Sequence, residues 1–471
     1  MKEKMINING AEMKCYPLAA ATRMHNFTVK YCPAHQVLNI GTGLYVKQDI
    51  DFNLLKKAIY MAYERCEAMR LRFVLDEEGE TWQYIVPTED RDIEFVDFSH
   101  WQEEAAHNEM RRWTGIPFER YNSPMNRIVM IKLPDGYNGV YAKFDHMTMD
   151  SSSLIIFERD ILEIYCALRY GTKMPGSMTS YIKALEKDLE YEADSPARKR
   201  DEEFWMNELA RPEPMYTDFN GVGRLITQRR ESGNPDLRSA VIVSRSIEAA
   251  ISTYRLEAEP TQRLLDFCSE NNVPMTSLLL MGLRTVLSQF NNGEKDVSVK
   301  TNVARRGTIL EKRCGGTRIH FFPLRTILEP ELTFLEGVRE IQKEQMRIFR
   351  HANLDPVELT MRRSKMLHLA PGASYESISL TYQPLTSQRA SAEMPDIPYK
   401  SMWYTNGTAA QPLYLTIMHR PEDNGLNFNF EYKKDAVTEQ EMEVFYYYFC
   451  RALFRGIEDK DRTIGEILEM I

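Results

Sequence analysis

The chain has 471 residues, of which 43% are hydrophobic and 27% charged, and its formal net charge is −9 at pH 7. This composition is typical of a folded globular protein, and the length favours two domains or lobes over a single core. Mild acidity without any Lys/Arg block argues against nucleic acid or a membrane surface as partner. Because no apolar leader or membrane-spanning run is present, we expect a cytoplasmic protein.

Along the first half of the chain, apolar periodicity predicts alternating strands and helices. Strands are expected at 38–48, 126–133 and 139–146, a hairpin at 70–87, and helices from about 52, at 99–113 and from about 153.

The second half repeats this alternation. It predicts helices at 261–271, 275–290, 332–350 and 438–455, and strands near 239–256, 296–303, 319–327, 376–382, 412–420 and 426–433. Residues 171–237 are polar and rich in turn formers. We therefore predict an α/β protein with an N-terminal lobe at 1–178 and a C-terminal lobe at 179–471, of which 179–237 is a variable connection.

The seven cysteines, at positions 15, 32, 66, 166, 268, 314 and 450, are odd in number and never spaced as CxxC. Neither a disulfide framework nor a structural metal site is expected from them.

The segment KFDHMTMDSSS (143–153) places a histidine at the end of an apolar strand and an aspartate four residues later. Alternation along the strand puts His146 on the apolar face with Phe144, and turns Asp145 the other way. Half-buried there, His146 is either a neutral general base or a hydrogen-bonded histidine at a strand end. Asp150 is either its orienting carboxylate or a structural partner of an arginine. A second such spacing, from His351 to Asp355, shows that the pattern alone does not identify a catalytic histidine.

The surrounding motifs resemble the condensation domains of nonribosomal peptide synthetases, within the chloramphenicol-acetyltransferase-like superfamily marked by HxxxD. In order along the chain, the matching segments are PLAAATRMHNF (17–27), ERCEAMRLRF (64–73), IPFERYNSPMNRIVMIKL (116–133), KFDHMTMDSSS (143–153), FWMNELA (204–210), NVARRG (302–307), GGTRIHFFPLR (315–325), HANLDPVE (351–358), SISLTYQP (377–384) and FEYKKD (430–435). The resemblance covers about residues 15–470. It implies two acetyltransferase-like α/β lobes in a V, with the active site and a tunnel at their junction.

Carried over residue by residue, the resemblance makes His146 the catalytic histidine. It makes Asp150 a structural residue that pairs with Arg65, or failing that with Arg70. It aligns the segment around His351 with a structural part of the family.

The chain departs from the family pattern at three positions. Asp145 stands where the family has a first histidine, Ser151 where it has glycine, and His320 where it usually has asparagine. Serine resists some backbone torsions that glycine adopts, so the local backbone at Ser151 is in question. Asp145, Ser151 and His320, with Trp403 and Asn406 near the family's crossover between lobes, are expected to border the site.

The resemblance implies an acyltransferase without a covalently bound cofactor, and no metal is expected because a thioester is already activated. Because the sequence has no carrier-like Gly-x-Asp-Ser-Leu site and no adenylation domain, we expect a free-standing protein. Its donor would be an acyl thioester on the phosphopantetheine arm of a carrier protein acting in trans, and its acceptor a small-molecule amine or, failing that, a hydroxyl. A monomer is sufficient for such a site.

Two rival functions remain open. The first uses acyl-coenzyme A in place of the carrier; a basic pocket for its phosphate would draw on Arg305, Arg306, Lys312, Arg313 and Arg318. The second is a non-catalytic condensation-like docking module, which the altered Asp145 and Ser151 keep possible.

Overall fold

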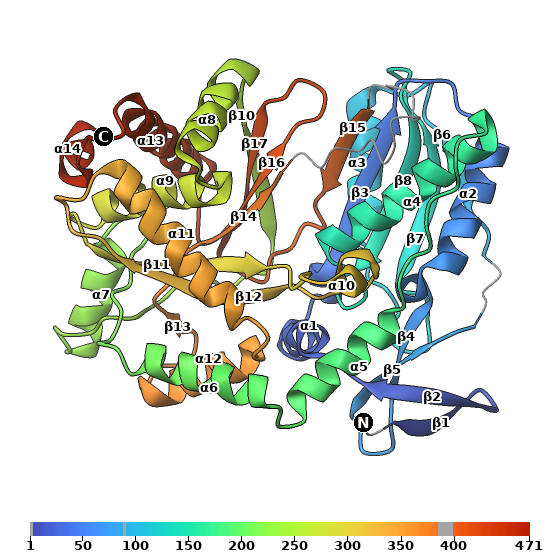
Figure 1. Cartoon of the computed structure of the whole chain (residues 1–471), viewed down its shortest axis with the longest axis horizontal. Helices are drawn as coiled ribbons and strands as arrows, with labels where there is room; N and C mark the ends of the chain where they lie inside the picture. The colour runs from blue at the N-terminus through green and yellow to red at the C-terminus, as the bar shows by residue number, and fades with distance from the viewer. Residues whose placement is uncertain (1–2, 88–90, 385–398) are drawn as a thin grey trace. The chain divides into compact units, whose positions relative to one another are not determined.

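The computed structural model describes residues 3–87, 91–384 and 399–471, and it divides into two compact units (Figure 1). Unit 1 comprises residues 1–198, 304–319 and 386–408, and unit 2 comprises 199–303, 320–385 and 409–471. The single boundary expected near residue 178 differs from this division. The chain returns to unit 1 twice, through tertiary contacts that no local sequence pattern signals.

Unit 1 is built on a five-stranded sheet in the order β15-β3-β8-β7-β6. Its strands are β3 (Asn39–Val46), β6 (Glu94–Asp97), β7 (Asn126–Lys132), β8 (Asn138–Asp145) and β15 (Tyr399–Tyr404). β6 and β7 run parallel and the other neighbours antiparallel. The central strand β8 is buried along its whole length, so its C-terminal end is held firmly.

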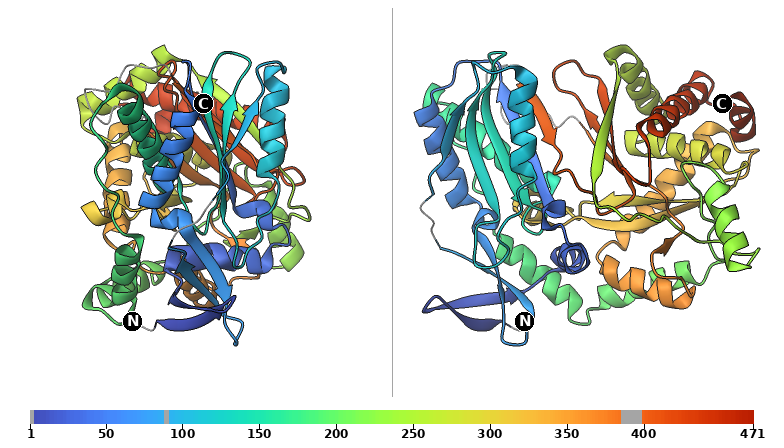
Figure 2. Two further views of the ribbon diagram at one scale, coloured as in Figure 1. Left: turned by 90° about the vertical axis from the view of Figure 1, so that its right-hand side faces the viewer. Right: turned by 180° about the vertical axis from the view of Figure 1, so that it is seen from behind.

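Helices cover both faces of this sheet (Figure 2). α2 (Phe52–Arg65) and α4 (Ser151–Tyr170) pack on one face, and α3 (Glu103–Thr114) packs on the other. On β8, Val140, Ala142 and Phe144 belong to the core under α2 and α4, whereas Tyr141 belongs to the core under α3. The alternation predicted for residues 140–144 is confirmed, whereas the strand ends at Asp145 and His146 lies in the turn that follows.

The remainder of unit 1 consists of smaller elements. It contains a four-stranded sheet in the order β1-β2-β5-β4 together with short helices. These elements are β1 (Lys4–Ile8), β2 (Ala11–Pro17), α1 (Ala20–Tyr31), η1 (His35–Leu38), η2 (Glu67–Arg70), β4 (Leu71–Leu75), β5 (Thr81–Ile85), α5 (Tyr181–Glu192) and α10 (Ile309–Arg313).

Unit 2 repeats the α/β style with a six-stranded sheet in the order β10-β17-β16-β14-β11-β12. Its strands are β10 (Ala249–Leu256), β11 (Asp296–Val303), β12 (His320–Ile327), β14 (Ser379–Gln383), β16 (Leu413–His419) and β17 (Leu426–Lys433). Its longer helices are α8 (Ala258–Asn271), α9 (Met275–Phe290), α11 (Phe334–Arg350) and α13 (Glu439–Glu458). The smaller elements are α7 (Gly223–Ser232), β9 (Ala240–Val241), α12 (Pro356–Met366), β13 (Ala373–Ser374) and α14 (Ile464–Met470), and α6 (Pro196–Leu209) carries the chain from unit 1 into unit 2.

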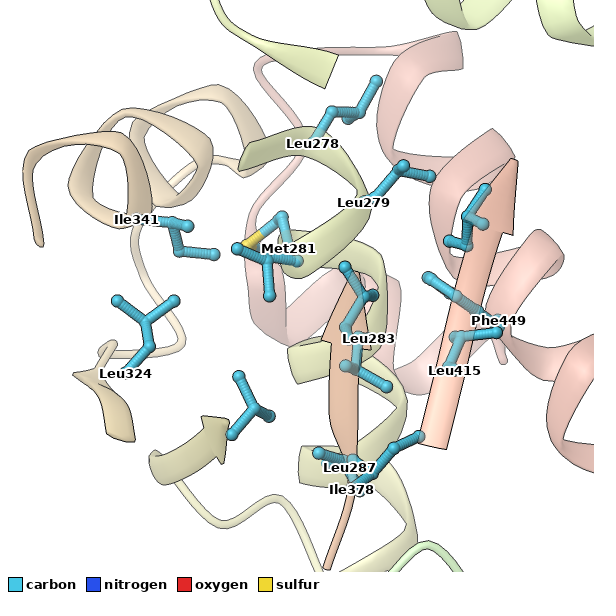
Figure 3. Packing of buried hydrophobic residues seen from close by; sticks show 14 of the residues in the cluster. Leu278, Leu279, Met281, Leu283, Leu287, Leu324, Ile341, Ile378, Leu415 and Phe449 are labelled. Carbon is cyan, nitrogen blue, oxygen red and sulfur yellow. The ribbon is translucent and has the colours of Figure 1, made fainter. Parts of the chain in front are cut away.

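The core of unit 2 forms around α9, whose side chains are buried on nearly every side (Figure 3). Leu283 of α9 lies near Leu415 of β16 and Phe449 of α13 in this core. Strands β16 and β17 alternate buried and partly exposed residues, so one face of the sheet carries the helices. Within the described residues, no helix has the length and apolar character needed to cross a membrane.

Candidate active site

The candidate site lies in unit 1, in the loop that joins β8 to α4. The loop begins where β8 ends at Asp145, and the backbone N–H of His146 donates to the Leu38 carbonyl over 2.8 Å. It ends at Asp150, which is the N-cap of α4. A buried strand and a capped helix thus fix both ends of the segment that carries the predicted catalytic histidine.

His146 is partly exposed, and within the described residues its buried Nδ1 has no hydrogen-bond partner. Its ring stacks on that of His25 from α1, with ring centroids 4.1 Å apart and an angle of 25° between the planes. Burial lowers the pKa of His146 below its ordinary value of 6.5, and the charge of Asp150 offsets this only in part. The imidazole is therefore neutral at pH 7, the form that accepts a proton.

Asp150 is buried, and its carboxylate accepts four hydrogen bonds within the part of the chain that the structure describes. Its carboxylate accepts bonds from Ser153 N (2.9 Å) and Oγ (2.6 Å), from Arg306 Nη2 (3.0 Å) and from the backbone N–H of Arg318 (2.8 Å). Burial by itself would raise the pKa of Asp150, but Arg306 and these donors outweigh it and lower the pKa. Of the two roles considered, the structure gives Asp150 that of a buried, charged anchor.

The prediction that Asp150 pairs with Arg65 or Arg70 is wrong. Arg65 instead forms a bidentate ion pair with Asp160 (2.8 and 3.0 Å), and Arg70 donates to the carbonyls of Val86 and Pro87. Asp160 lies ten residues further along α4, about 15 Å from Asp150 at the helical rise. Arg65 therefore supports the middle of α4 and is not the partner of Asp150.

Arg306, in the segment 304–319, is the residue that pairs with Asp150. Besides the carboxylate, it donates to the carbonyls of Glu311, Cys314 and Gly316. Sequence reasoning missed this role, since 156 residues separate the two partners. The one feature of the sequence that could have indicated this role is the two adjacent arginines in NVARRG (302–307).

Two further arginines of this segment also form ion pairs with a carboxylate. Arg305 and Arg318 both pair with Asp188 of α5, with closest distances of 2.8 and 3.0 Å, and both side chains are buried. Three members of the basic group considered for coenzyme A therefore hold buried carboxylates. This argues against the expectation that these three residues form a phosphate pocket.

Asp145, which replaces a family histidine, is buried and turned into the protein. Its carboxylate pairs with Arg120 (3.3 Å) and accepts from the backbone N–H of Met147 (2.8 Å). Burial raises the pKa of Asp145, and Arg120 opposes the rise. Asp145 thus shapes the turn that presents His146.

Ser151 is the first residue of α4, and it is not among the described residues with positive φ. Its position makes no demand that only glycine could meet. The concern that this substitution disturbs the backbone is removed.

The remaining predicted border residues divide between the units. In unit 2, His320 is fully buried and its Nδ1 bonds the Ala352 carbonyl (2.9 Å). In unit 1, Trp403 of edge strand β15 is 38% exposed, and Asn406 donates to the Asn39 carbonyl (3.0 Å). His320 and Asn406 have structural contacts, whereas Trp403 is partly open to solvent.

The second HxxxD spacing is structural, as expected. His351 bonds Asp201 (2.9 Å) and stacks on Phe204, while Asp355 caps α12. Each of the two residues thus has a structural contact of its own.

Within the described parts of the chain, all seven cysteines are free. The same residues contain no group of three or more His, Cys, Asp or Glu side chains placed to hold a metal ion.

Comparison with known proteins identifies the family of this chain. The Condensation domain family model matches residues 12–470. Among curated proteins of Bacillus subtilis (strain 168), the chain is 24% identical over 457 residues to one of the subunits of plipastatin synthase and 26% identical over 467 residues to surfactin synthase subunit 1. These matches span 96% and 97% of this chain but only 17% and 12% of the relatives.

Solved structures show the same fold. The first condensation domain of the calcium-dependent antibiotic synthetase, in complex with a substrate analogue, matches with a TM-score of 0.79 at 19% identity, over 96% of this chain and 99% of that one. The starter condensation domain of rhizomide synthetase, a mutant in complex with C8-CoA, matches with a TM-score of 0.79 at 19% identity, over 96% of each chain. The chain belongs to the condensation domain family of nonribosomal peptide synthesis, whose members are acyltransferases that form amide or ester bonds.

Proposed function

We propose that this chain transfers an acyl group from a carrier-protein phosphopantetheine thioester to an amine, with His146 as general base. The observation that carries the proposal is the partly exposed, neutral imidazole of His146, held between a buried strand end and a helix cap. Nδ1 is buried, so Nε2 is the nitrogen that serves the substrate.

The step balances without metal or redox chemistry. The amine nitrogen attacks the thioester carbonyl and gives its proton to Nε2 of His146. Collapse of the tetrahedral intermediate breaks the C–S bond, and the thiolate of the arm takes a proton back. Such base assistance is typically worth about 10²–10⁴-fold in rate, and alignment of the two substrates supplies the rest.

The carrier-bound donor is preferred over coenzyme A because three of the arginines considered for a phosphate pocket already form ion pairs. Arg305, Arg306 and Arg318 are buried in ion pairs within unit 1. Releasing one of them to a phosphate would leave a buried carboxylate unpaired, which is costly. The complex of the rhizomide starter domain with C8-CoA keeps acyl-coenzyme A as a second donor to test.

The test is intact-mass detection of product with acyl-loaded carrier proteins and an amine, comparing wild type with His146→Ala. We expect turnover to fall at least about 10²-fold in His146→Ala, and to stay at the wild-type rate in His100→Ala, which removes an exposed histidine. Undiminished product formation by His146→Ala would refute the proposed base.

The donor arms of the same assay separate the alternatives. Transfer from acyl-coenzyme A but from no carrier would establish the coenzyme A reaction. Absence of product with both donors, despite tight carrier binding, would identify a docking module. A hydroxyl acceptor in place of the amine tests ester formation.

A further inference from the structure

A second histidine lies against the catalytic candidate. His25, on α1, stacks its ring on that of His146 at a centroid distance of 4.1 Å. His25 is only 6% exposed, and within the described residues its Nε2, like Nδ1 of His146, is buried without a hydrogen-bond partner. The contact between the two rings is therefore one of faces and not a hydrogen bond.

Helix α1 is held firmly enough to position this ring. Arg23, two residues before His25, forms a bidentate ion pair with Glu192 at the end of α5 (2.9 and 3.0 Å) and donates to the Leu18 carbonyl. Thr22 and Asn26, on either side of His25 in the sequence, are buried. Because α1 is fixed around His25, the ring presents a rigid surface to its neighbour.

We propose that His25 is a positioning residue for His146: it fixes the orientation of the imidazole and shields one of its faces from water. This inference rests on the proposed role of His146 as general base. A ring that cannot rotate about its side-chain torsions keeps Nε2 directed at the acceptor, and geometric precision of this kind has a large effect on rate.

Electrostatics add a second effect of the stack. Two protonated imidazoles at this separation would repel one another, and the repulsion is stronger in a protein interior than in water because the effective dielectric is lower. Burial, and then the proximity of His146, lower the pKa of His25 well below 6.5. The two histidines together therefore take up at most one proton near neutral pH, and His25 remains uncharged.

Two carboxylates close to His146 in the chain are paired with arginines. Asp150 at the start of α4 favours the imidazolium, but Arg306 neutralises much of its charge. Asp145, next in the chain, is paired with Arg120. With both carboxylates paired to arginines, desolvation, to which His25 contributes, is the main influence on the pKa of His146.

The experiment compares His25→Ala with His25→Phe, which keeps a stacked ring but removes the nitrogens. In His25→Ala, water reaches His146, so its pKa should rise toward the ordinary value of about 6.5. The acid limb of the kcat profile should then move to higher pH. At pH 8, kcat should fall about 10-fold or more with little change in KM. His25→Phe should keep the wild-type titration and most of kcat.

The titration is read directly by NMR of ¹³C-histidine-labelled protein, with the His146 signal assigned from His146→Gln. This readout does not depend on turnover, so it separates a failure of the positioning role from a failure of the proposed reaction. An unchanged His146 titration in His25→Ala, or an equal shift in His25→Phe, would overturn the inference.

Discussion

At the scale of the residue, the ion pair of Asp150 and Arg306 is the interaction that fixes the site. Both side chains are buried, and each makes several other hydrogen bonds. Burying two charges carries a desolvation penalty, which good geometry repays only when the remaining donors and acceptors are also satisfied. The ion pair therefore holds the loop that carries His146 in one conformation.

Removing one partner of this pair is expected to destabilise the protein strongly. Asp150→Ala should lower the free energy of unfolding by about 3–5 kcal/mol, because Arg306 is left as an uncompensated buried charge. Asp150→Asn keeps an oxygen for the Ser153 bonds, so its loss should be smaller. Urea unfolding measures both. Equal stability of Asp150→Ala and wild type would contradict the structural role.

The sign of the pH dependence follows from the lowered pKa of Asp150. A carboxylate whose pKa is lower in the folded state contributes stability above its unfolded pKa of 3.8, and loses it as pH falls through the folded pKa. Asp150→Asn should therefore remove part of the acid-induced destabilisation below about pH 4. Unfolding measured across the acid range up to neutral pH would show a shallower acid slope in this variant.

At the scale of the element, α9 and α13 approach closely in the core of unit 2, and a glycine permits the approach. A Cβ added at Gly282 of α9 would lie 2.6 Å from Leu453 and 2.7 Å from Phe449, both of α13. Figure 3 shows Phe449 beside the neighbouring residues of α9. Side chains this tightly packed have little room to move away.

Gly282→Ala is expected to destabilise the protein by about 1–3 kcal/mol, because overpacking outweighs the gain in helix propensity. Gly223→Ala is the matched control, since nothing lies within 4 Å of its added Cβ at the start of α7. That variant should be neutral or slightly stabilising. Thermal unfolding of both tests the argument, and a stabilised Gly282→Ala would contradict it.

Amphipathic spacing is what made such elements predictable. α9 occupies residues 275–290, as predicted from its apolar stripe. By contrast, α5, α6 and α7 lie in the segment interpreted as a variable connection, and none of them was predicted. Few residues of α6 and α7 are buried. Helices whose faces are mostly polar give no periodic signal, so α6 and α7 were missed.

At the scale of the whole molecule, unit 1 depends on segments that lie far along the chain. β15 forms the edge of its sheet beside β3, and the segment 304–319 supplies Arg306 to Asp150 and Arg318 to Asp188. The sequence 1–198 by itself therefore lacks an edge strand and leaves two buried carboxylates without their arginines.

We accordingly expect a fragment of residues 1–198 to fail to fold alone. Circular dichroism and size-exclusion chromatography should show an aggregated or loosely folded species, because unpaired buried charges and an open sheet edge both oppose a compact state. Co-expression with residues 199–471 should restore a folded complex. A monomeric fragment 1–198 that unfolds cooperatively would contradict this expectation.

The sequence by itself determined the α/β class, the positions of most strands and amphipathic helices, the alternation of faces along β8, and the family, because these depend on local periodicity and on ordered motifs. Only the tertiary structure decided that Arg306 rather than Arg65 holds Asp150, that Asp145 pairs with Arg120, and that His25 stacks on His146. Those contacts join residues brought together by packing of buried elements, and the pairing of charges in a folded core leaves no periodic trace in the chain.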